Sequence, residues 1–151
     1  MRGTESMYKK SLRIISIILV LSAMLMICAV AAYIPPDSPD ASAYINSYSV
    51  SIINGGSGKL KVDFDITGTG TMTKIGASCI KIYKSSGAHV ATIWHTDSGR
   101  GGMMGSNKAY HSDVEAYTVT PGKYYVIITF YAKNSSGWDA QSVQTGTKTI
   151  T

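Results

Sequence analysis

Residues 59–66 read Lys59-Leu60-Lys61-Val62-Asp63-Phe64-Asp65-Ile66. Charged and apolar side chains alternate at every position, and in an extended chain successive side chains point to opposite sides. The stretch therefore predicts a strand with one buried face and one face in water. Burial of a single face is typical of antiparallel sheets, because strands of parallel sheets are covered on both faces.

The same period of two recurs along the rest of the chain, between turn signals such as Pro121-Gly122. Seven strands are predicted, at residues 48–52, 59–66, 80–82, 88–95, 114–120, 124–132 and 142–150. The polar stretch Thr96–His111, which is rich in Gly and Ser, predicts one long loop. Strands at intervals of roughly 8–12 residues indicate a β-sandwich. We therefore expect an all-β, seven-stranded antiparallel sandwich with no helix beyond residue 41.

The first 31 residues have the layout of a secretory signal peptide, including a signal helix. A basic head precedes the uncharged run Ile14–Val30, and small residues follow at Ala29-Val30-Ala31-Ala32. We expect cleavage between Ala31 and Ala32, then a Pro-rich spacer at 32–41 and a sandwich domain at 42–151. Because a spanning helix needs about 20 apolar residues, an uncleaved membrane anchor is the alternative. Both readings place the domain outside the cytoplasm, secreted or tethered to the outer face of the membrane.

Charge and cysteine content exclude several classes of function. Of 14 basic and 9 acidic residues, four basic and one acidic lie in residues 1–31, which leaves ten against eight in the remaining 120 residues. These basic residues are scattered, so we expect no nucleic-acid partner. Cys79 is the only cysteine after the leader, which leaves it no intramolecular partner for a disulfide. We expect a buried free thiol there.

Two H-x-D pairs, His95-x-Asp97 and His111-x-Asp113, bracket the long polar stretch. If its ends converge, two imidazoles and two carboxylates could bind Zn²⁺ and support a small metal-dependent hydrolase. The alternative is that the four residues organise turns through their own backbone. We favour the turns, and predict no catalytic residue, cofactor or bound metal.

Aromatic residues are the chain's one surplus. Tyr125 and Tyr131 belong to the second face of a strand whose first face is already apolar, and Trp94 and Trp138 lie close to turns. Exposed planar rings bind sugars or peptides at low entropic cost, so these four residues are the ligand-binding candidates. The alternative is that the strand is central, with its second face covered by neighbouring side chains or by the long loop.

Two resemblances add to this reading. Residues 121–125 (PGKYY) and 130–137 (FYAKNSSG) resemble the E–F corner, F strand and F–G turn of fibronectin type III domains. That resemblance implies an immunoglobulin- or fibronectin-like sandwich with a corner tyrosine, Tyr124 by its inward phase or else Tyr125. From about Ser42 onward, the chain is also similar to an uncharacterised family of small secreted proteins of Gram-positive bacteria, through strings such as 74–77 (KIGA) and 96–99 (TDSG). That similarity implies secretion and one small β domain.

Together these patterns predict a non-enzymatic binding domain that works outside the cytoplasm. Its partner would be a protein or a cell-surface glycan, and the membrane would be touched only by an uncleaved leader. A carbohydrate-binding module that uses the exposed Trp and Tyr residues is the first alternative, and the metal-dependent hydrolase is the second.

Overall fold

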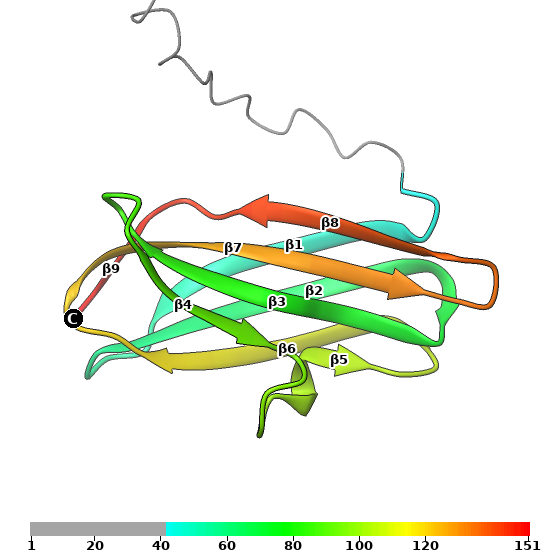
Figure 1. Cartoon of the computed structure of the whole chain (residues 1–151), viewed down its shortest axis with the longest axis horizontal. Coiled ribbons are helices and arrows are strands. Elements are labelled where there is room, and N and C mark those ends of the chain that lie inside the picture. Colours follow the sequence, from blue (N-terminus) through cyan, green and yellow to red (C-terminus); the bar gives the residue numbers. More distant parts are fainter. Residues whose placement is uncertain (1–41) are drawn as a thin grey trace, which may run out of the picture. The chain divides into compact units, whose positions relative to one another are not determined.

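The computed structural model describes residues 42–151, which form two antiparallel sheets packed as a sandwich (Figure 1). Sheet A has the strand order β1-β2-β6. Sheet B has the order β4-β3-β7-β8, with β5 paired to β3 and β9 paired to β7. The strands are β1 (Ile45–Asn54), β2 (Lys59–Met72), β3 (Lys74–Lys84), β4 (His89–Trp94), β5 (Met104–Gly105), β6 (Lys108–Thr118), β7 (Gly122–Lys133), β8 (Trp138–Gln144) and β9 (Lys148–Ile150).

The predicted leader (1–31), its cleavage site at Ala31 and Ala32, and the spacer (32–41) lie outside the described residues. Within residues 42–151, no helix has the length and apolar character needed to cross a membrane.

Residues 59–66 form the first half of β2, and the burial predicted from their alternation is confirmed. Leu60, Val62, Phe64 and Ile66 are at most 1 % exposed and point into the space between the sheets. Their charged neighbours point to the outer face of sheet A. Because β2 pairs with β1 on one side and β6 on the other, this strand lies in the middle of sheet A.

The opposite wall of the core comes mainly from β7, the central strand of sheet B. Its inward row is Tyr124, Val126, Ile128, Phe130 and Ala132, all buried. Phe130 joins the two sheets, because its ring stacks on Tyr48 of β1 at 4.9 Å and meets the edge of Phe64 of β2 at 6.1 Å. Aromatic pairs at these separations add to the free energy gained by burial.

All seven predicted strands are present, and the antiparallel sandwich is confirmed. The last one is divided into β8 and β9, which pair with different parts of β7. The prediction of one long loop at Thr96–His111 is wrong. This segment contains a 3₁₀ turn, η2 (Gly101–Met103), all of β5 and the start of β6. The reason lies in β6, which turns His111 and Glu115 inward and leaves Tyr110 and Val114 exposed. Its apolar residues therefore do not mark its buried face.

Tyr124 is the corner tyrosine that the sequence predicted from its inward phase, and the rival position, Tyr125, lies on the outer face. The Tyr124 side chain is buried, and its hydroxyl donates to the Thr120 carbonyl oxygen at 2.6 Å. Its ring also lies against Gly122 at the turn. The hydrogen bond connects the end of the β6–β7 connection to the start of strand β7, as in other tyrosine corners.

Replacing Tyr124 with Phe is expected to lower the free energy of unfolding by about 1–2 kcal/mol, because it removes one buried hydrogen bond while keeping the packed ring. Urea denaturation followed by circular dichroism measures the change. Tyr125→Phe is the matched control on the same strand, and we expect it to change stability by less than about 0.5 kcal/mol. Equal effects of the two substitutions would contradict the corner assignment.

Candidate functional site

The outer face of sheet B carries the second row of β7: Tyr125, Ile127, Thr129 and Tyr131. All four side chains are only partly exposed, since β3 and β8 flank the strand on either side. The alternative in which neighbouring side chains cover this face is therefore partly correct. None of the four is buried, however, and two large aromatic residues on the neighbouring strands are exposed to solvent. Trp138 of β8 is 61 % exposed and Trp94 of β4 is 48 % exposed.

Two of the four predicted ligand-binding residues lie against each other on the outer face of sheet B. The rings of Tyr131 and Trp138 stack with centroids 5.9 Å apart and planes 28° from parallel. Trp138 is the register partner of Lys133, two residues from Tyr131, so the two rings are diagonal neighbours on one face. We call this pair the aromatic platform. Because Trp138 begins β8 directly after a turn, few side chains cover it.

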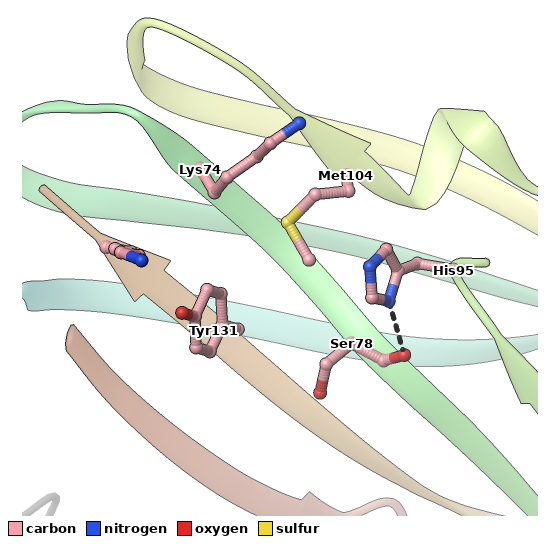
Figure 2. Close-up of a pocket in the computed structure, with 6 residues that line it drawn as sticks. Lys74, Ser78, His95, Met104 and Tyr131 are labelled. Carbon is pink, nitrogen blue, oxygen red and sulfur yellow. Dashed lines mark hydrogen bonds between the residues drawn. The ribbon is translucent and has the colours of Figure 1, made fainter.

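An open groove of about 310 Å³ lies next to the aromatic platform. Figure 2 shows the side chains of Tyr131, Met104 and His95 around the same space. Six residues line it: Lys74, Ser78, His95, Met104, Tyr131 and Lys133. Tyr131 therefore belongs both to the platform and to the groove wall.

The groove exists because the edge of sheet B is interrupted. β4 pairs with β3 only as far as Trp94 opposite Cys79, whereas β5 pairs with Ile75 and Gly76. Between these pairings, β3 has an irregular register opposite β7, between Ala77 and Cys79, which leaves Ser78 as an extra residue. Such bulges redirect a side chain and bend the strand locally.

Hydrogen bonds hold three of the residues that line the groove in place. The Ser78 hydroxyl donates to the Thr129 carbonyl at 3.0 Å, and the Ser78 carbonyl lies 3.1 Å from Nδ1 of His95 (Figure 2). The Lys74 ammonium donates to the Ser106 hydroxyl at 3.0 Å. The groove is therefore formed by groups already fixed within the protein, which lowers the entropic cost of binding.

The ionisable side chains that line the groove are all basic: two lysines, one histidine and no carboxylate. The nearest carboxylate in sequence to Trp138 is Asp139, and it faces the other side of the sheet. There it accepts hydrogen bonds from the Ser42 hydroxyl at 2.5 Å and from the Tyr44 amide at 3.0 Å. The Ser42 hydrogen bond, followed by that of Tyr44, lowers the pKa of Asp139 below its usual value.

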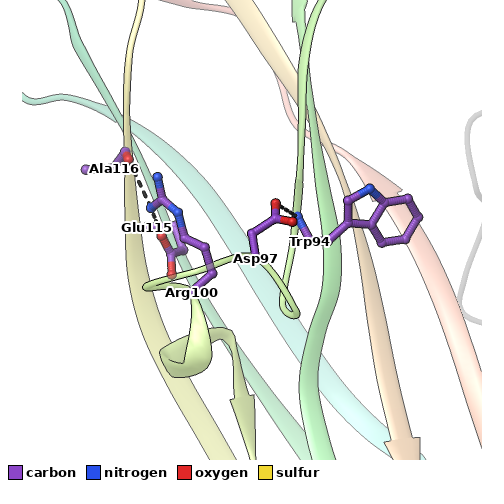
Figure 3. Close-up of polar contacts among 5 residues, drawn as sticks. All are labelled: Trp94, Asp97, Arg100, Glu115 and Ala116. Carbon is purple, nitrogen blue, oxygen red and sulfur yellow. Dashed lines mark hydrogen bonds and ion pairs between the residues drawn. The ribbon is translucent and has the colours of Figure 1, made fainter.

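The other two predicted ligand-binding residues, Tyr125 and Trp94, do not stack with the platform. Tyr125 is six positions from Tyr131, about 20 Å along an extended strand. It stacks on Tyr83 of β3 with centroids 5.2 Å apart, and Tyr83 in turn meets the edge of His89. Trp94 lies at the end of β4, and its indole points away from the neighbouring loop (Figure 3). The outer face of sheet B thus carries aromatic side chains at both ends.

The four metal candidates each have a structural contact of their own. His95 bonds to Ser78, and the Asp97 carboxylate accepts from the Trp94 amide at 2.8 Å in a turn (Figure 3). Nε2 of His111 lies 2.7 Å from the Gly102 carbonyl, and a Cβ at Gly102 would lie 2.7 Å from the Asp113 carboxylate. Within residues 42–151, no three His, Cys, Asp or Glu side chains are grouped so that they could hold a metal ion.

An ion pair fixes the segment that follows β4. Arg100 donates to the inward-facing carboxylate of Glu115 on β6 and to the Ala116 carbonyl (Figure 3). Burial raises the pKa of Glu115 above its ordinary value, although the Arg100 hydrogen bond and charge oppose this. Because η2 and β5 follow Arg100 directly, the ion pair also helps to hold Met104 at the groove wall.

Reasoning from sequence missed Lys74, Ser78, Met104 and Lys133 as lining residues. Lys133 follows Tyr131 on the same strand face, so the period of two was enough to place it there. No local sequence pattern indicates Lys74, Ser78 or Met104, because a bulge and a two-residue strand bring them into position. Compared with known proteins, the chain matches no family model and no curated protein.

Proposed function

We propose that this protein is a non-enzymatic binding domain, secreted or held at the outer face of the membrane, and that it binds a glycan on the outer face of sheet B. The aromatic platform beside the open groove is the observation that carries the proposal. The leader expected at residues 1–31 is the reason for placing the domain outside the cytoplasm. An extracellular site would give it access to cell-surface polysaccharides.

The shape and chemistry of the site suit a sugar chain. Sugar rings present flat C–H faces that pack on aromatic rings, and Tyr and Trp provide this contact at low entropic cost. Trp138 is 61 % exposed, more than any other large hydrophobic side chain on the described surface. Small-molecule sites usually enclose most of their ligand. The groove here is open to solvent on the outer face of the sheet, so a bound sugar chain would extend beyond it.

The polar groups of the groove favour binding over catalysis. Nucleophilic catalysis needs a hydroxyl or thiol within hydrogen-bond reach of a base. Here the His95 ring bonds to the Ser78 carbonyl, while the Ser78 hydroxyl donates to the Thr129 carbonyl. Both groups are thus engaged with the backbone, and the groove lining offers no carboxylate to act as an acid or base.

Tryptophan fluorescence tests the proposal, because the chain has only two tryptophans, Trp94 and Trp138. In a Trp94→Phe variant of the full chain, Trp138 is the sole reporter. Titration with a panel of soluble cell-wall and extracellular polysaccharides is expected to shift its emission for at least one polymer. A spectrum that no member of the panel changes would contradict the proposal.

Removing the platform should then weaken that binding. We expect Trp138→Ala to lower the affinity for the polymer about tenfold, which corresponds to the loss of one stacked ring. Trp94→Phe, which retains an aromatic ring away from the platform, serves as the control and should leave the affinity unchanged. Isothermal titration calorimetry measures both variants. Equal affinity of Trp138→Ala and the unmodified protein would show that the glycan binds elsewhere.

A further inference from the structure

We propose that the ligand of this site is an acidic polysaccharide whose sugar units carry carboxylates, held by Lys74 and Lys133 while a sugar ring packs on Trp138. This inference rests on the proposed function, since it assigns the chemical class of the glycan bound at the same platform. Three observations carry it: the pairing of the two lysines, the distribution of charge over the domain, and the position of Trp138 beside them.

The two lysines stand directly opposite each other on neighbouring strands. Lys74 of β3 and Lys133 of β7 are register partners, and both side chains are exposed and line the groove. Like charges at directly opposite positions destabilise a sheet. The one ion pair within residues 42–151 is Arg100–Glu115, so no carboxylate in this part of the chain neutralises either lysine. A bound anion would remove this repulsion.

Basic side chains lie on the outer face of sheet B, and the acidic side chains of the domain lie elsewhere. The outer face of sheet B bears Lys74, Lys81, Lys123 and Lys133, whereas no acidic residue lies on the outward rows of β3, β4, β7 or β8. The acidic side chains of residues 42–151 lie elsewhere, at Asp63, Asp65, Asp97, Asp113, Glu115 and Asp139. The field over the groove is therefore positive, and residues 42–151 as a whole carry ten basic against six acidic side chains. A positive cleft of this kind raises the local concentration of polyanions.

Trp138 lies next to the lysine pair. It is the register partner of Lys133, so the order across three strands is Lys74, Lys133 and Trp138. Neighbouring strands are about 4.8 Å apart, which places indole and ammonium groups side by side on one face. A sugar acid stacked on the indole would hold its carboxylate at the Lys133 ammonium. A flexible polyanion without sugar rings could use the lysines but would gain nothing from the platform.

The test compares polygalacturonate with its fully methyl-esterified form, two probes that share one sugar backbone and differ in charge. By calorimetry with the full chain, we expect the acidic polymer to bind about tenfold more tightly, as two exposed charge contacts allow. We also expect its affinity to fall as salt rises from 0.05 to about 0.5 M, because salt screens exposed charges. The esterified polymer should show little dependence on salt.

Variants assign the effect to the lysine pair. The double variant Lys74→Gln/Lys133→Gln should lose the preference for the acidic polymer while keeping its thermal stability. Lys123→Gln is the matched control, since it removes one charge from the same strand about 33 Å away and should keep the preference. If Trp138→Ala weakens binding of both polymers while the lysine variants change neither, the acidic ligand is wrong and the proposed function stands.

Two further outcomes would overturn the inference. Binding of poly(glycerol phosphate) that requires the lysines but not Trp138, with no binding of polygalacturonate, would assign the site to a phosphate polymer instead. Failure of polygalacturonate to bind, with retained binding of a neutral polymer from the panel, would also exclude an acidic sugar while leaving glycan binding intact. Failure of every polymer would remove the proposed function as well.

Discussion

Phe130→Ala is expected to lower the free energy of unfolding by about 3–5 kcal/mol, the range for removing a buried aromatic ring. Phe130 is fully buried and contacts Tyr48 of β1 and Phe64 of β2 from the central strand of sheet B. Its removal leaves a cavity at the place where the two sheets meet. Because β2 and β7 are each paired on both sides, they have little freedom to close the cavity.

Urea denaturation followed by tryptophan fluorescence and circular dichroism measures this loss. Ile127→Ala is the matched control, three residues along β7 with its side chain on the partly exposed outer face. We expect that substitution to cost about 1 kcal/mol, as partial burial of an apolar side chain predicts. Similar losses for the two variants would mean that the inward and outward rows of β7 are wrongly assigned.

Gly76→Ala is expected to lower stability by about 2–5 kcal/mol, comparable to loss of a buried methionine. A Cβ at Gly76 would collide with the Met103 carbonyl oxygen and would lie 2.9 Å from Cα of Met104. Both are backbone atoms of the segment that pairs with β3, so β5 would have to move away. Met103, which is fully buried, would leave the core with it. An isolated glycine in a strand often marks such a close approach of backbones.

The same substitution should also damage the groove, because Met104 forms one of its walls. We expect Gly76→Ala to weaken polymer binding even under conditions where the domain remains folded. Gly101→Ala is the control in the same segment, since a Cβ there meets no atom within 4 Å. A Gly76→Ala protein with unchanged stability and binding would show that β5 does not pack on β3 as described.

Only part of the candidate site could be predicted from the sequence. Tyr131 is predicted because it lies on the second face of an already apolar strand, and Trp138 because it is an aromatic residue close to the turn that follows. Lys74 could not be connected to them, since it lies about 60 positions away and joins them only through the pairing of β3 with β7. Tyr125 and Trp94 are aromatic residues like Tyr131 and Trp138, yet the fold stacks only Tyr131 and Trp138 on each other.

The failure in the 96–111 segment has a different physical cause. The alternation rule assumes that the inner face of a strand is apolar, but β6 directs His111 and Glu115 inward. Contacts with the Gly102 carbonyl and with Arg100 satisfy these groups, and both partners lie in the connection that leads to β6. Polar groups are buried where they find hydrogen-bond partners, and such partners depend on tertiary folding.

By itself, the sequence determined most of the strands, the apolar faces of β2 and β7 and the class of fold, down to the inward Tyr124. Each of these depends on side chains one or two positions apart, because a pleated chain turns alternate residues to opposite faces. Tertiary structure alone decided that Lys74, Lys133 and Trp138 lie opposite one another on three neighbouring strands and that Met104 of the two-residue strand β5 forms a wall of the groove. Register between strands distant in sequence is set by packing of the whole core, and no local pattern encodes it.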